Sequence, residues 1–196
     1  MGILGTPDKG IPRDLLDKSA CVVVLPSVKK AGFIVGGEYG RGAITCRSGQ
    51  DLRGPWSAPA MFALEGASVG FQVAGEATDL VLLIMNDKGA ESVMSSKVKI
   101  GADASAAVGP VGRTTSAETD AVMKAQILTW SKARGVFGGV SLEGSTLRSD
   151  DGANKSLYGK EMSAKEIVRE GQAKTPPAGT QLIDLLMKTT PKRAAS

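Results

Sequence analysis

The feature that most constrains this chain is a glycine-rich stretch that follows a short apolar run. The apolar run occupies residues 21–25, and glycine then fills four of the six even positions between residues 32 and 42. Alternate residues of a strand face opposite sides of a sheet, so these glycines would share one face that has almost no side chains. Glycine in a strand favours a sharp bend or the close approach of another backbone, a helix or a ligand. We therefore expect the centre of a bent or tightly packed sheet, with a ligand groove as the alternative.

Further patterns predict more strands and a few short helices. Strand patterns occur at residues 60–64, 67–74, 80–85, 97–100, 126–132 and 135–142. Short helices are expected at residues 11–20, with Pro12 as the first helical residue, and at residues 90–95, 164–170 and 181–187. Turns or polar loops are expected at residues 27–30, 65–66 and 150–154. The predicted fold class is α+β, a curved or barrel-like, mainly antiparallel sheet flanked by short helices.

The chain divides into three parts by composition. Residues 1–10 form a flexible lead-in, residues 11–170 a single domain, and residues 171–196 a proline-containing linker, a short helix and a basic tail. The length of 196 residues with 42% apolar residues fits one soluble domain. The apolar runs are too short to cross a bilayer, and no charged-then-apolar signal segment opens the chain.

The composition excludes most catalytic mechanisms. The chain has no histidine, so it lacks the commonest general base and the usual zinc ligand. Its two cysteines make neither a disulfide scaffold nor a four-ligand zinc site, and we expect Cys21 and Cys46 to be buried thiols. The net charge of +4 favours anionic surfaces without requiring nucleic acid, and 4% aromatic residues supply few stacking platforms.

Several short motifs match chemical sites only in part. Residues 27–30 match the S-x-x-K of Ser-Lys acyltransferases, but a proline precedes them and no S-D-N or K-T-G motif follows. The glycine run at residues 36–42 lacks the order G-x-G-x-x-G, and residues 150–154 lack the order of an EF-hand. Residues 109–113 would suit a phosphate, but a plain turn is favoured. We therefore expect a protein that is not an enzyme and that has no metal and no cofactor.

Ten motifs, taken in order and spacing, resemble the SYLF domain family, known also from yeast actin-patch proteins. They are IPxxLL from Ile11, VLPSVKKAGF from Val24, GGxxGxG from Gly36, WSAPA from Trp56, GFQ from Gly70, TDLVL from Thr78, GADA from Gly101, GPVGR from Gly109, KARGVFGGVSLEG from Lys132 and YG from Tyr158. The resemblance covers residues 11–170 and leaves the remaining residues outside it.

The resemblance implies a lipid-binding module. Eukaryotic members of this family bind phosphoinositide-containing membranes through a basic, amphipathic region at the start of the domain, and some fungal members also bind and bundle actin filaments. A lone SYLF domain is similar to the bacterial branch, which is commonly exported or lipid-anchored. This likeness implies a peripheral membrane protein of the bacterial periplasm or envelope.

The resemblance also places a candidate site at the start of the domain. The expected lipid-binding residues are Arg13, Lys18, Lys29, Lys30 and Arg41, and the expected membrane-inserting residues are Ile11, Leu15 and Leu16. We expect the helix at residues 11–20 and a turn at Lys29 and Lys30 to bring an apolar face and basic side chains into one region. Without the resemblance, the basic set would be a solvated fringe partly cancelled by neighbouring acids.

Three functions follow from these observations. The leading one is non-catalytic binding of anionic, phosphoinositide-like phospholipids at a membrane surface. The alternative is a protein-interaction module that binds actin-like filaments or envelope proteins. The third is an unrecognised enzyme, which would need a deep pocket that gathers carboxylates or that joins Ser27 to Lys30.

Overall fold

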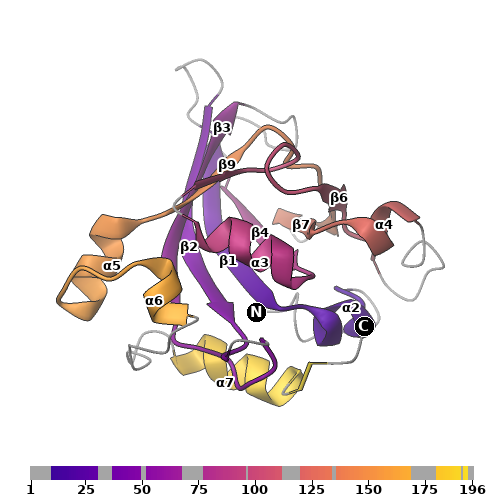
Figure 1. Ribbon diagram of the computed structural model, residues 1–196. Helices are drawn as coiled ribbons and strands as arrows, with labels where there is room; N and C mark the ends of the chain where they lie inside the picture. The colour runs from indigo at the N-terminus through magenta and orange to yellow at the C-terminus, as the bar shows by residue number, and fades with distance from the viewer. Residues whose placement is uncertain are drawn as a thin grey trace.

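One curled sheet organises the protein (Figure 1). The computed structural model describes residues 10–30, 37–49, 52–67, 77–95, 97–111, 120–133, 136–168, 180–190 and 192–193. The strands are β1 Cys21–Lys30, β2 Gly37–Cys46, β3 Ala60–Ala67, β4 Ala77–Ile84, β5 Lys97–Lys99, β6 Ala106–Val108, β7 Ile127–Ala133, β8 Val136–Gly139 and β9 Thr146–Ser149.

The strand order is β5-β9-β3-β2-β1-β4-β7-β6, with β8 also paired to β7. Every neighbouring pair is antiparallel except β6 and β7, which are parallel. The expected α+β class with a curved, mainly antiparallel sheet is confirmed.

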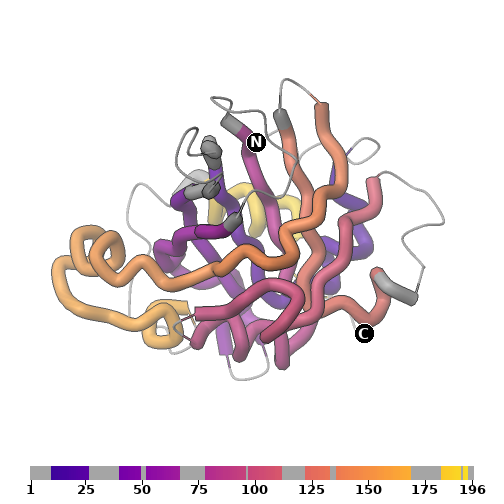
Figure 2. Tube along the Cα trace, turned by 90° about the horizontal axis from the view of Figure 1, so that it is seen from above, coloured from indigo at the N-terminus to yellow at the C-terminus, as the bar shows by residue number. Residues whose placement is uncertain are grey.

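Short helices cover both faces of this sheet. They are α2 Arg13–Lys18, α3 Asp87–Met94, α4 Asp120–Lys124, α5 Asp151–Tyr158, α6 Ala164–Val168 and α7 Thr180–Thr189. α3 and α6 contribute to a first core, whereas α2, α4 and α7 contribute to a second core. Figure 2 shows α7 on the far side of β1 and β2 from α3. Among the described residues, no helix is long and apolar enough to cross a membrane.

Alternation along β1 explains why the sheet has two cores. Cys21, Val23 and Leu25 lie in the first core, whereas Val22 lies in the second. All four of these residues are completely buried. Since successive strand residues face opposite sides, a continuous apolar run such as this one indicates a strand that is covered on both faces.

The two cysteines are bonded to each other, which corrects the expectation of buried thiols. Cys21 begins β1 and Cys46 ends β2, and the antiparallel register places them opposite each other with their Cα atoms 4.0 Å apart. The two residues are 25 positions apart in the sequence. Cysteine counting missed this bond because the pairing depends on the register of the hairpin, which composition does not contain.

The glycine-rich strand does pack closely against a neighbouring backbone. A Cβ atom at Gly42 on β2 would lie 1.9 Å from the carbonyl oxygen of Val24 on β1. This contact confirms the close approach expected for the glycine face at this position. Gly32 and Gly36 lie outside the described residues.

The turn expected at residues 27–30 is wrong, because β1 continues as a strand to Lys30. The register of β1 against β4 shifts between Leu25 and Val28, and Pro26 lies within this irregularity. Proline lacks a backbone N–H, so a bulge is where a central strand tolerates it. The proline was therefore a sign of a bulge rather than of a turn.

Two other local expectations are also wrong. Residues 65–66 continue β3 instead of turning, and the loop expected at residues 150–154 is the start of α5. Asp150 is the N-cap of α5, and its side chain accepts a hydrogen bond from the N–H of Ala153. An aspartate at this position stabilises a helix start, so the acidic cluster has a structural role.

Candidate functional site

The predicted membrane-inserting helix is docked on the sheet. α2 follows Pro12, which is the N-cap rather than the first helical residue. Ile11, Leu15 and Leu16 are 4%, 5% and 2% exposed and lie in the second core. Their insertion into a bilayer stays a prediction, and it would require α2 to leave the sheet.

Arg13 is tied to the other end of the chain. Its side chain is 58% exposed, its Nε lies 4.0 Å from Asp17 Oδ2, and its Nη2 donates to the carbonyl oxygen of Thr189 at 2.6 Å. Lys18 is half-buried at the last turn of α2. The structure therefore places Arg13 and Lys18 near the end of α7.

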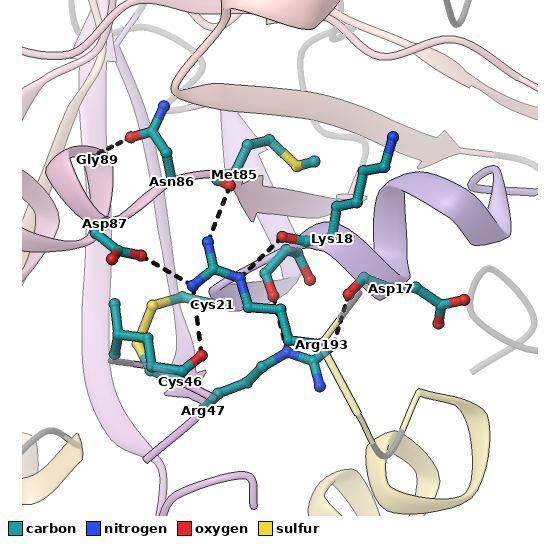
Figure 3. Close-up of polar contacts among 12 residues, drawn as sticks. Asp17, Lys18, Cys21, Cys46, Arg47, Met85, Asn86, Asp87, Gly89 and Arg193 are labelled. Atoms are coloured by element: carbon teal, nitrogen blue, oxygen red, sulfur yellow. Dashed lines mark hydrogen bonds and ion pairs between the residues drawn. A yellow bond between two sulfur atoms is a disulfide. The ribbon is translucent and has the colours of Figure 1, made fainter. Parts of the chain in front are cut away.

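A buried arginine, Arg47, joins α2 to the residue after α7, and Figure 3 shows it beside Asp17 of α2. Arg47 is fully buried and donates to the carbonyl of Ser19 at 2.8 Å and to Thr190 Oγ1 at 2.9 Å. Further bonds reach the carbonyls of Thr190, Leu16 and Asp17. These acceptors include carbonyls that the C-terminal turn of a helix leaves without an intrahelical partner.

The environment of Arg47 is shaped by burial and by an aromatic ring. Its guanidinium carbon lies 4.4 Å from the centre of the Trp56 ring, and Trp56 Nε1 donates to the carbonyl of Thr190 at 3.0 Å. The pKa of Arg47 is lowered from 12.5 to about 10, mainly by burial and then by the nearby charge of Arg193, while Asp17 opposes the shift. Arg47 remains charged near neutral pH, so this is a structural lock made from carbonyl acceptors and a ring.

A second arginine, Arg193, binds the residues after α7 to the rest of the domain. Arg193 is 9% exposed, and its Nη1 lies 2.8 Å from Asp87 Oδ1. It also donates to the carbonyls of Lys18 at 3.2 Å and Met85 at 3.4 Å (Figure 3). Arg193, which the sequence placed in a basic tail, is therefore turned into the fold. The division of the chain at residue 171 stays a prediction, but Thr190 and Arg193 do not stand apart from the domain.

Lys29 and Lys30 lie at the opposite end of β1 from α2. They pair with Tyr39 and Glu38, whereas Cys21 at the other end of the strand follows α2 closely. At about 3.3 Å per residue, eight residues of strand separate the two places by roughly 25 Å. The single region expected from the sequence is wrong, because the predicted turn is an extended strand.

Strand register groups the basic residues differently from the sequence. Arg41 on β2 pairs with Ala63, Ala63 pairs with Arg148 on β9, and Arg148 pairs with Lys97 on β5. The next row runs through Lys29, Tyr39, Glu65, Thr146 and Lys99. Cross-strand partners share a face of the sheet. We use the name basic face for the cations of these rows whose side chains the structure describes, which are Arg41, Lys97, Lys99 and Arg148.

Carboxylates partner two members of the basic face. Arg41 is 64% exposed, and its Nε lies 3.3 Å from Oδ2 of the buried Asp150. Arg148 Nη2 lies 2.8 Å from Glu65 Oε1, and this hydrogen bond is the main cause that lowers the pKa of Glu65. Lys97 and Lys99 are exposed. The face therefore presents two lysines beside two arginines whose charges are partly balanced.

Sequence reasoning found Arg41 and Lys29 but missed the other members of these rows. The spacing of Lys97 and Lys99 does signal one face of a strand. This spacing did not show which strands lie between β5 and β2, because β9 was not predicted. The β1 bulge also matters, since it shifts the register so that Lys29, and not Val28, pairs with Tyr39.

One cavity lies beside α5 and α6 and bears on the enzyme alternative. Its volume is about 560 Å³, and it is lined by Asp151, Gly152, Lys155, Glu161, Met162, Ser163 and Glu166. Lys155 and Glu161 are 62% and 86% exposed and lie 3.7 Å apart. Ser163 and Glu166 cap α6 by exchanging hydrogen bonds with each other's backbone N–H. Asp151 and Glu161 are exposed, whereas Glu166 is half-buried and caps α6.

Comparison with known proteins gives a consistent family. The model of the family Ysc84, described as "Las17-binding protein actin regulator", matches residues 65–189. The human "SH3 domain-containing YSC84-like protein 1" is 33% identical over 187 residues, which are 95% of this chain and 53% of that protein.

Two proteins of Saccharomyces cerevisiae match in the same way. "Protein YSC84" is 33% identical over 182 residues, covering 91% of this chain and 38% of that protein. "LAS seventeen-binding protein 3" is 33% identical over 190 residues, covering 95% and 39%. The chain thus spans about half the length of these relatives or less. The family match extends to residue 189, beyond the boundary expected at residue 170, and so includes α7.

Proposed function

Since the chain belongs to the Ysc84 family of SYLF-domain proteins, we propose that it is a non-catalytic module that binds anionic, phosphoinositide-like phospholipid at a membrane surface. The names of its relatives describe binding or regulatory proteins rather than enzymes. The observation that carries the lipid proposal is the basic face, which gathers cations from β2, β9 and β5 on one side of the sheet.

The charges of this face favour weak, reversible docking. Each Lys or Arg near an anionic bilayer contributes on the order of 1 kcal/mol. Lys97 and Lys99 are exposed, while Arg41 and Arg148 keep carboxylate partners. Salt screens exposed charges over a distance of about 8 Å at physiological ionic strength, so binding should weaken as salt is added.

The predicted lipid-binding and membrane-inserting residues on or beside α2 would act after the first contact with the membrane. Arg13 and Lys18 lie by α2, away from the basic face, and Ile11, Leu15 and Leu16 are buried. Insertion of this apolar face would require α2 to separate from α7 and from Arg47. We therefore assign the first contact with lipid to Lys29 and the basic face, and we reserve Lys30, Arg13 and Lys18 for closer binding.

Flotation with vesicles tests the proposal. The variant Lys97→Glu with Lys99→Glu should lose capture by phosphatidylcholine vesicles that contain phosphoinositide or phosphatidylserine at low salt. A matched control, Lys160→Glu with Lys165→Glu, changes the net charge equally at exposed positions on or beside α5 and α6. Equal capture of the two variants would contradict a lipid site on this face. Lys29→Glu with Lys30→Glu tests the strand end separately.

A protein partner is the second candidate function. The family description and the name of a yeast relative both refer to binding of Las17, and the description also refers to actin. The same basic face would suit an acidic filament surface. Cosedimentation with actin filaments, set against vesicle flotation, separates the two candidates. Sedimentation with filaments but no flotation would support the second.

The proposal includes an oxidising compartment such as the periplasm or cell envelope. The Cys21–Cys46 disulfide supports this location, because such bonds persist outside reducing compartments. Trapping free thiols with a maleimide during denaturing lysis tests it. Labelling of both cysteines in the freshly lysed source cell would contradict it.

A further inference from the structure

The two ends of the sheet are protected very differently. Among the described strands, β5 lies at one end beside β9, while β6 and β8 lie at the other end beside β7. Edge strands offer unpaired backbone groups, and proteins commonly protect them with lysine or proline. β5 has two exposed lysines in three residues, whereas β6 and β8 contain neither a charged residue nor a proline.

β6 and β8 together form one margin, which we call the β6–β8 margin. β6 pairs with the first half of β7 and β8 pairs with its second half. The two strands meet at the carbonyl of Thr129, which accepts from Gly109 N at 3.0 Å and from Val140 N at 3.2 Å. A Cβ atom at Gly139 would lie 2.5 Å from Val108 Cγ1, so the strand ends touch.

Exposed apolar side chains gather on the elements of this margin. In the described part of the chain the large exposed hydrophobic residues are Val108, Met123, Val136 and Met187. Val108 is on β6, Val136 is on β8 and is 72% exposed, and Met123 is on α4, which contacts β6. Only Met187, on α7, lies elsewhere among these four. Exposed apolar residues gathered in this way mark a contact surface.

The backbone of β8 is oriented for a further strand. Val140 donates to Thr129, so the antiparallel ladder alternates from that pair and directs the N–H and C=O of Phe137 away from β7. None of the described strands other than β7 pairs with β8. A strand added there would exchange two hydrogen bonds with Phe137.

We propose that the β6–β8 margin pairs with the same margin of a second copy of this chain, with β8 antiparallel to its symmetry mate. A two-fold contact sets the same surface of both copies face to face, and this uncharged margin avoids the repulsion that like charges would cause. Pairing Phe137 with its counterpart sets Val136 opposite Gly138 of the other copy. Nothing lies within 4 Å of a Cβ atom at Gly138, so the exposed Val136 has space to fill.

This dimer does not depend on the proposed lipid function, but it would extend it. The margin is made by β6 and β8 and the basic face by β2, β9 and β5, so the two surfaces share no strand. Two basic faces on one dimer would bind a membrane more tightly than one, because the second contact becomes intramolecular. Short edge strands bury less than the roughly 1,200 Å² of a stable interface, so the dimer should be weak.

Sedimentation equilibrium of the full chain over a range of concentrations tests the proposal. The 20.2 kDa chain should show a reversible shift toward twice its mass as its concentration rises. Val136→Lys should weaken the dimer at least tenfold by placing a charge in the contact, and Gly138→Val should do so by filling the gap. Met187→Lys, an exposed apolar position on α7, is the matched control and should leave dimerisation unchanged.

Two further measurements distinguish a loss of dimerisation from a loss of folding. Unfolding curves that match the wild type establish that the variants fold, and slower amide exchange at Phe137 on dimerisation would identify the paired strand. A wild-type chain that stays monomeric at every concentration overturns the proposal. So does a dimer that Val136→Lys and Met187→Lys weaken equally, because the contact would then lie off the margin.

Discussion

Replacing Arg47 by methionine should lower the free energy of unfolding by about 3 kcal/mol. Methionine matches the apolar stem of arginine but has no donors, so Ser19 O and Thr190 Oγ1 lose bonds of 2.8 and 2.9 Å. A buried acceptor left without a partner costs about 1–3 kcal/mol. Loss of the contact with the Trp56 ring at 4.4 Å adds about 2 kcal/mol.

Removing the buried charge offsets part of this loss. Burial, together with the charge of Arg193, lowers the pKa of Arg47 from 12.5 to about 10, a change that corresponds to roughly 3 kcal/mol of disfavoured charging. Two buried acceptors left without partners and the lost ring contact together cost about 6 kcal/mol. Relief of the roughly 3 kcal/mol of disfavoured charging leaves about 3 kcal/mol of destabilisation.

Urea unfolding followed by tryptophan fluorescence measures this effect. Trp56 lies against Arg47, so its emission should also shift to the red in the folded variant. The exposed Lys165 provides a control, and Lys165→Met should change stability by about 0.5 kcal/mol or less. A double-mutant cycle with Thr190→Val should give a coupling of about 1 kcal/mol or more. A loss below about 1 kcal/mol for Arg47→Met would refute the lock between α2 and the chain end.

Three further predictions concern stability. Reducing the Cys21–Cys46 bond should cost roughly 3 kcal/mol in urea unfolding, and an unchanged midpoint would count against a structural bond. Gly42→Ala should destabilise by more than about 2 kcal/mol, since its Cβ would meet the backbone of Val24; wild-type stability would show that the two strands are not in close contact. Burial raises the pKa of Tyr158 to about 12, so stability should be complete below pH 10 and fall as pH rises from 10 to 12. Tyr158→Phe should abolish this fall, and ultraviolet titration that ionises both tyrosines near pH 10 would refute it.

The parts of the fold that depend on local pattern were predictable. The strands β4 and β7 were predicted from their sequences, and residues of both strands lie in the first and the second core. The helix at α2 was found from its apolar stripe, but nothing in that stripe shows that α7 lies beside it. The bond from Arg13 to Thr189 spans 176 positions, and no local pattern reports such a contact.

The candidate site was predictable only in fragments for the same reason. Arg41 and Lys29 were chosen as basic residues near the start of the domain, yet their neighbours in space come from β5 and β9. The strand at β5 was predicted, but β9, which lies between β5 and β3, is four residues long and too short for a clear periodic signal. Register, including the bulge in β1, decides which cations share a face, and register is a property of the folded sheet.

The most direct test of the central claim is to observe which face contacts lipid. Amide spectra of the isotope-labelled chain would be recorded with anionic bicelles that carry a paramagnetic lipid. The account predicts strong broadening at Lys97, Lys99, Thr146 and Arg148, with little effect at Lys160 and Lys165. Broadening confined to α2, or to the β6–β8 margin, or absent altogether, would contradict the assignment of the basic face as the membrane-binding surface.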